Sequence, residues 1–95
     1  MSGVAEGTVL PLARVDGLEI NQEEDGFIVY QPETDRVHYF NHTGILILEL
    51  CDGRRSPAEI ADLLKRAYDL PEAPQREVDE VLARMRDEGL VQETQ

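Results

Sequence analysis

The spacing of apolar residues changes once along this chain of 95 residues, close to Asn41. Before that point, apolar residues alternate with polar ones or form short β-branched and aromatic runs between turn residues, which is typical of strands. After that point, apolar residues recur at helical spacing between capping and breaking residues. The sequence therefore predicts a set of strands followed by a set of helices in one small α+β domain.

The first half predicts a three-stranded antiparallel meander over about residues 14–41. The expected strands are Leu18–Asn21, Phe27–Tyr30 and Arg36–Phe40. Asp25-Gly26 is a strong hairpin dipeptide, because glycine supplies the positive φ that tight turns need. Pro32 and Asp35 favour a second turn before the last strand.

The second half predicts three helices. The apolar run Ile45–Cys51 could be a buried strand or a buried helix, but the capping residues Asn41–Thr43 before it and Gly53 after it favour a short helix. Ser56-Pro57-Ala58-Glu59 is a capping box with proline in the first turn, and it starts a second helix that Tyr68–Pro71 closes.

The third helix is expected to start near Pro74 and to end at Gly89, with Leu90-Val91 folding back onto its last turn. Its apolar stripe has i, i+3, i+4, i+7 spacing and consists of Val78, Val81, Leu82 and Met85. The predicted fold is a winged-helix-like domain over residues 11–91, with a three-stranded antiparallel sheet followed by three helices. Residues 1–10 and 92–95 are expected to be tails.

Charge and cysteine content restrict the class of function. The chain has 20 Asp and Glu against 9 Lys and Arg, so the net charge is −11. This charge argues against a general nucleic-acid binder and against binding to anionic membranes. A single cysteine, Cys51, excludes a disulfide framework, and no apolar run reaches the ~20 residues of a membrane span. We expect a cytoplasmic protein; Met1 and the polar end favour a free-standing one.

Several motifs together resemble one known family. They are Glu24-Asp25-Gly26, Tyr30-Gln31-Pro32, Arg36 to Asn41, Leu50-Cys51-Asp52-Gly53 and Glu59-Ile60. Their order and spacing resemble the PqqD-like family of peptide chaperones, also called RiPP recognition elements, over about residues 11–91. The chain departs from the usual family pattern at His42, Gly44 and Leu48.

The resemblance implies a binding protein without chemistry of its own. Such a protein holds the leader segment of a ribosomally made precursor peptide and presents it to a modifying enzyme, often a radical-SAM enzyme. The leader adds as a strand to the third strand and lies against the third helix. We expect a monomer, with no cofactor and no metal.

The residues can support this mode of binding. The third strand of a meander has a free edge, and an extended peptide can pair with it. Val37 and Tyr39 would share one face of the strand, and His38 and Phe40 the other. The stripe on the last helix would form an apolar wall, although it also suits the core. The predicted peptide site comprises Arg36, Val37, His38, Tyr39, Phe40, Val78, Val81, Leu82 and Met85.

Two other classes of function fit the sequence less well. A winged-helix DNA-binding regulator needs a basic recognition helix, but residues 75–88 carry three arginines against five carboxylates, a net charge of −2. An acyl or peptidyl carrier needs a serine for its prosthetic arm at a helix start, typically in Asp-Ser-Leu. The only serines are Ser2 and Ser56, and Ser56 stands in Arg-Ser-Pro.

Individual polar residues give weak signals of chemistry. Cys51 lies in an apolar run and suits a buried thiol better than a nucleophile. His38 and His42 are four residues apart, but they fall on a strand and a loop, with no further cluster to complete a metal site. Glu23-Glu24-Asp25 lacks the spacing of a calcium loop. We therefore predict no catalytic residues and no enzyme activity.

Overall fold

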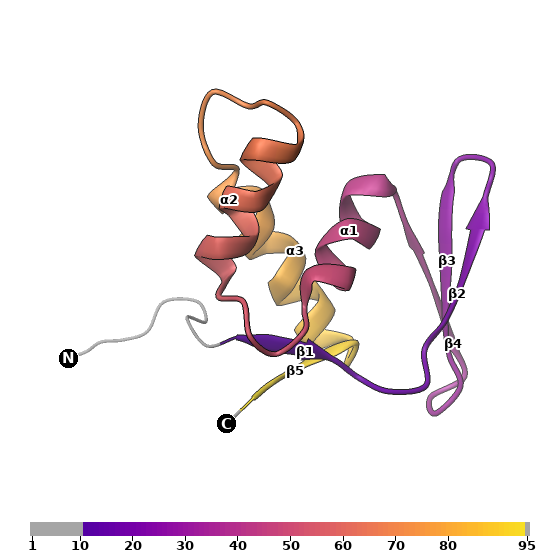
Figure 1. Ribbon diagram of the computed structural model, residues 1–95. Helices are drawn as coiled ribbons and strands as arrows, with labels where there is room; N and C mark the ends of the chain where they lie inside the picture. Colours follow the sequence, from indigo (N-terminus) through magenta and orange to yellow (C-terminus); the bar gives the residue numbers. More distant parts are fainter. Residues whose placement is uncertain (1–10, 95) are drawn as a thin grey trace.

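The computed structural model describes residues 11–94, with helices on one side of a three-stranded sheet (Figure 1). The elements in chain order are β1 (Leu12–Arg14), β2 (Glu19–Glu23), β3 (Gly26–Gln31), β4 (Arg36–Phe40), α1 (His42–Leu50), α2 (Pro57–Ala67), α3 (Gln75–Asp87) and β5 (Val91–Glu93). Strands β2, β3 and β4 form the predicted antiparallel meander, and the three predicted helices follow it. The predicted fold class is therefore confirmed.

The first hairpin differs from the prediction by one position. Glu23 pairs with Gly26, so Glu24 and Asp25 occupy the turn and Gly26 begins β3. Glycine is needed there because a Cβ atom would lie 2.5 Å from the carbonyl oxygen of Phe40 on β4. A close approach of two backbones, and not the turn itself, accounts for this glycine.

The second turn connects β3 to β4 as predicted. Gln31 pairs with Arg36 across it. The Thr34 N–H donates to the Gln31 carbonyl oxygen at 3.2 Å, and Asp35 has a left-handed φ of 56°. Aspartate tolerates this conformation better than most residues.

Local capping explains where the helices begin and end. The Asn41 side chain accepts from the Gly44 N–H at 2.7 Å and starts α1, so the ambiguous run is helix as far as Leu50, with Cys51 as the C-cap. Both halves of the Ser56–Glu59 capping box are present at α2. After α3 the Leu90 N–H donates to the Met85 carbonyl oxygen at 2.9 Å, so the chain folds back as expected.

A second, two-stranded sheet corrects the expected ends of the domain. Arg14 was placed in the meander, but it lies in β1, whose partner is β5. Gln92 and Glu93, expected in a polar tail, are part of β5. Strands of three residues carry little periodicity, and the two partners lie at opposite ends of the chain, so local sequence gives no signal of this pairing. The expected tail at residues 1–10 lies outside the described residues.

The core lies between the meander and the helices. Val29 and Phe40 of the sheet pack with buried residues of all three helices, including Leu48, Leu64 and Leu82. Leu12 of β1 and Val91 of β5 are also buried in this cluster. In residues 11–94, no helix is both long and apolar enough to cross a membrane.

Candidate functional site

Strand β4 forms a free edge of the three-stranded sheet. Along Arg36–Phe40 it pairs with β3, and it has no other strand partner among residues 11–94. In an antiparallel pair, alternate residues point their backbone N–H and C=O groups to opposite sides of the strand. Every second residue of β4 therefore presents a donor and an acceptor that a further strand can satisfy.

The other free edge of this sheet, β2, is less suited to pairing. Its sequence is Glu-Ile-Asn-Gln-Glu, and all of these side chains except Ile20 are exposed. Charges on an edge strand disfavour the addition of another strand. In β4 a single charged residue, Arg36, is followed by valine, histidine, tyrosine and phenylalanine.

The two faces of β4 differ as the alternation predicted. Val37 and Tyr39 point to the face away from the helices and are 50% and 71% exposed. His38 and Phe40 point toward the core and are 5% and 7% exposed. An added strand would therefore meet apolar surface on one face of the sheet and the end of α3 on the other.

A polar network joins the buried face of β4 to β3 and α3. The His38 Nε2 atom lies 2.9 Å from Oε1 of Gln31, and the Gln31 side-chain amide donates to the Gly89 carbonyl oxygen at 3.3 Å. The other ring nitrogen of His38, Nδ1, lies 3.1 Å from Oε1 of Glu88. Both ring nitrogens of His38 thus lie beside side-chain oxygen atoms, one on β3 and one at the end of α3.

Arg84 connects α3 to β4 a second time. Its guanidinium carbon lies 5.5 Å from the centre of the Phe40 ring, a cation–π contact. Its Nε atom also lies 3.8 Å from Oε1 of Glu88. Arg84 and Glu88 thus lie on the side of α3 beside β4, and the half-buried Val81 shares this face of the helix.

The stripe predicted to form a wall on α3 is mostly internal. Val78, Leu82 and Met85 are at most 2% exposed and belong to the core, because α1 and α2 cover that side of α3. Val81 is the one member of the stripe that is partly exposed. The pattern found the apolar face of the helix correctly. The apolar pattern did not include Arg84 and Glu88 because both are charged. They follow Val81 by three and seven residues, and this helical spacing is the sequence signal that places them on the same face.

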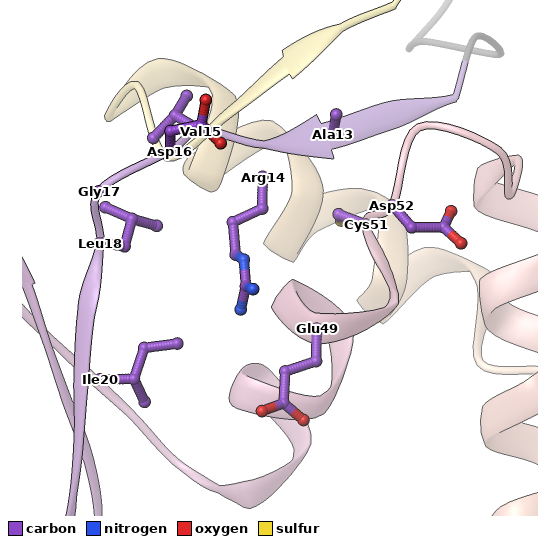
Figure 2. Close-up of a pocket in the computed structure, with 10 residues that line it drawn as sticks. All are labelled: Ala13, Arg14, Val15, Asp16, Gly17, Leu18, Ile20, Glu49, Cys51 and Asp52. Carbon is purple, nitrogen blue, oxygen red and sulfur yellow. The ribbon is translucent and has the colours of Figure 1, made fainter.

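Open hollows lie beside the meander. One of about 400 Å³ lies between β1, the following connection and the end of α1, and Figure 2 shows the Arg14 side chain reaching into it. A second of about 650 Å³ lies beside the β2–β3 turn and is lined in part by Tyr39, Phe40 and Asn41. The second hollow therefore continues the surface at the end of β4.

The reactive side chains are not gathered into one site. Cys51 is buried, its thiol donates to the Ile47 carbonyl oxygen at 3.2 Å, and burial raises its pKa to about 11. His42 makes an edge contact with Phe27, while His38 belongs to the network above. Across residues 11–94, no group of three or more His, Cys, Asp or Glu side chains could hold a metal ion.

A protein-family profile matches the part of the chain that contains this site. The profile of the family described as "Coenzyme PQQ synthesis protein D (PqqD)" matches residues 26–91, more than half of the chain. The matched range begins with β3 and includes β4 and all three helices. A search of curated proteins found no significant match.

Three solved structures share the fold. "TbiB1 in Complex with the TbiA(beta) Leader Peptide" has a TM-score of 0.69 and 18% identity, and the match covers 87% of this chain and 98% of that one. "Lasso peptide synthetase B1 complexed with the leader peptide" has a TM-score of 0.65 and 16% identity, covering 86% and 98%. The PqqD truncation of Methylobacterium extorquens PqqCD, described as a functional, stand-alone RiPP recognition element, has a TM-score of 0.62 and 21% identity, covering 85% and 87%.

Proposed function

The chain belongs to the PqqD family, and on that premise we propose that it binds the leader segment of a ribosomally synthesised precursor peptide and presents it to a peptide-modifying enzyme. Radical-SAM enzymes are one class that such a domain would serve. The leader adds as a strand along Arg36–Phe40. The observation that carries the proposal is the free edge of β4. The outer face of this strand is apolar, and its sequence is less polar than that of β2.

In the proposed binding mode, the main chain of the leader supplies affinity and its side chains supply specificity. Main-chain hydrogen bonds to β4 supply affinity that tolerates many leader sequences. Side chains of the leader alternate between the two faces of the extended sheet. On the outer face they meet Val37 and Tyr39, and on the inner face they meet the surface where His38 and Phe40 contact α3.

We assign the residues of α3 two different roles in this site. Arg84 and Glu88 lie beside β4, Val81 shares their face of the helix, and all three would contact the inner side of the leader. Val78, Leu82 and Met85 support the site from the core by holding α3 in place. The predicted wall is therefore split into one contacting residue and three supporting residues.

Binding in this proposal involves no covalent step, and the domain is not an enzyme. Cys51 is the only cysteine of the chain. A thiol is nucleophilic as the thiolate, and burial of Cys51 raises its pKa to about 11, so the thiolate is scarce at neutral pH. The proposal assigns the chemistry to the partner enzyme.

The charges of α3 do not favour the DNA-binding alternative. Each arginine of the helix lies near a carboxylate: Arg76 is 3.6 Å from Glu80, and Arg86 is 3.5 Å from Glu93. Arg84 is directed to Phe40 and Glu88. A recognition helix needs free cations to approach phosphates, so we do not propose DNA binding.

The test is amide hydrogen exchange with and without precursor peptides encoded beside the gene for this chain. In the free protein, one alternate set of amides in Arg36–Phe40 should exchange quickly, because these amides have no partner in the sheet. Bound leader should slow exchange of that set by about tenfold or more.

Strand β2 supplies the control within the same experiment. Its residues, Glu19–Glu23, form the opposite free edge, and their exchange should not change on binding. Slowed exchange at β2 instead of β4, or binding without any change at β4, would contradict strand addition at β4. Failure of every such peptide to bind would contradict the leader-binding function.

A further inference from the structure

The face of the meander that points away from the helices carries an apolar patch. Tyr39 lies opposite Ile28 and Val37 opposite Tyr30 in the β3–β4 pairing, so the four side chains are neighbours on one face. Val37 and Tyr39 are exposed, and Ile28 and Tyr30 are half-buried and stand outside the core cluster. No described element covers this face (Figure 1). We call these four residues the outer patch.

The outer patch has an acidic surround. Residues 15–35 contain no Lys or Arg, and their seven acidic residues are Asp16, Glu19, Glu23, Glu24, Asp25, Glu33 and Asp35. Glu19 lies opposite Tyr30 and Glu23 opposite Gly26, which puts both glutamates on the same face as the patch. None of the ion pairs found within residues 11–94 involves these seven residues. Their charge is therefore available to a partner.

We propose that the outer patch docks the peptide-modifying enzyme, through an enzyme surface with an apolar centre and a rim of Lys and Arg. This inference rests on the proposed function and assigns a surface to its second partner. An exposed apolar patch with a polar rim is typical of a protein interface. The acidic rim selects a basic partner and speeds the encounter electrostatically.

Leader and enzyme can bind at the same time in this arrangement. A leader strand added to β4 extends the sheet sideways, contacts Val37 and Tyr39 at the edge of the outer face and leaves the rest of that face open. Neighbouring strands are spaced by ~4.8 Å, so β3 would lie about two spacings from the leader and β2 about three. The side chains of Ile28, Tyr30 and Glu19 would therefore stay free for the enzyme, and the leader would lie at the border of the interface.

The charge pattern disfavours other occupants of the patch. A second copy of this chain on the same face would bring two acidic rims together, which costs free energy. Residues 1–10 contain one charged side chain, Glu6, and cannot neutralise the rim. Nucleic acid and anionic membranes would be repelled.

A pair of matched double variants tests the proposal. Glu19→Lys/Glu23→Lys reverses the charge beside the outer patch, and Glu72→Lys/Asp79→Lys makes the same change in net charge near the start of α3; all four side chains are exposed. The probe is the purified modifying enzyme encoded beside the gene, titrated at low and at high salt. We expect the first variant to lose at least about tenfold in enzyme affinity at low salt and less at high salt, and the second to stay within about twofold of wild type.

Leader binding to the same variants separates the two proposals. Both double variants should bind the leader like wild type, because none of the substituted residues lies on β4 or beside it on α3. Equal losses of enzyme affinity in the two variants, or no enzyme binding by the wild type, would overturn the docking proposal while leader binding stands. Absence of leader binding in the wild type would overturn the proposed function instead.

Discussion

The Nδ1 atom of His38 lies 3.1 Å from Oε1 of Glu88, which links the middle of β4 to the C-terminal end of α3. The His38 side chain is 4% exposed and that of Glu88 is 28% exposed. The same ring reaches Gln31 on β3 through Nε2, at 2.9 Å. One side chain thus fixes the spacing between the free edge of the sheet and the helix beside it.

Replacing His38 should destabilise the domain more than replacing the other histidine. His38→Ala leaves polar atoms of Gln31 and Glu88 without their partner in a buried position, and we expect a loss of about 2–3 kcal/mol in the free energy of unfolding. His42 is exposed and makes one edge contact with Phe27, so His42→Ala should cost less than about 1 kcal/mol. Urea unfolding measures both. Equal losses would show that the His38 network contributes little to stability.

Substitutions in the helix stripe should separate supporting residues from contacting ones. Met85 is fully buried, so Met85→Asp places a carboxylate in the core and should cost more than about 3 kcal/mol, whereas Met85→Leu should cost less than ~1.5 kcal/mol. Val81 is half-buried, so Val81→Asp should leave the domain folded and weaken leader binding. Circular dichroism and a leader titration check these outcomes. A stable, folded Met85→Asp variant would contradict the core position of this residue.

Gly26 and Gly17 should respond differently to alanine. A Cβ atom at Gly26 would lie 2.5 Å from the Phe40 carbonyl oxygen, so Gly26→Ala must displace the backbone at the end of β4. At Gly17 a Cβ would have no atom within 4 Å, and only its left-handed φ of 85° opposes alanine, at a cost of about 1 kcal/mol. We expect Gly26→Ala to lower both thermal stability and leader affinity more than Gly17→Ala. The reverse order would argue against close packing of the hairpin on Phe40.

Cys51 should react slowly in the native state. Burial raises its pKa from 9.0 to about 11, so at pH 8 the folded chain has about 100-fold less thiolate than the unfolded chain. Alkylation at pH 8 should accordingly be at least about 100-fold faster in denaturant than in buffer. Since the unfolded thiol loses its proton first, the free energy of unfolding should fall as the pH rises from 9 toward 11. Fast alkylation in buffer would contradict the buried position of Cys51.

Several features of the fold could be predicted because they depend on neighbouring residues. The Ser56–Glu59 capping box and the Asn41 cap are made by side chains that bond to backbone within a few residues. The Pro32–Asp35 turn is closed by backbone hydrogen bonds of the same short range. The alternation along Arg36–Phe40 likewise follows from strand geometry alone. These signals were enough to predict the order of the meander and helices, and the two faces of β4.

Other features depend on which surfaces meet, and local sequence does not contain that information. The apolar stripe marked one face of α3, but whether that face is covered depends on α1 and α2. Packing of these helices buried Val78, Leu82 and Met85 and left Val81 half-buried. Arg84 and Glu88 lie beside β4. The predicted positions of the β4 side chains therefore agree with the structure, whereas three of the four α3 side chains lie in the core; their part in peptide binding stays a proposal.

The sequence by itself determined the turns, the caps, the strand alternation and the acidic charge, because each is a property of residues close together in the chain or of composition. Only the tertiary structure decided that β1 pairs with β5, that His38 bridges β3 and α3, and that most of the α3 stripe is internal. Each of these contacts joins segments that are far apart in the sequence. Their free energy comes from burial and hydrogen bonds that exist only once the whole domain has closed.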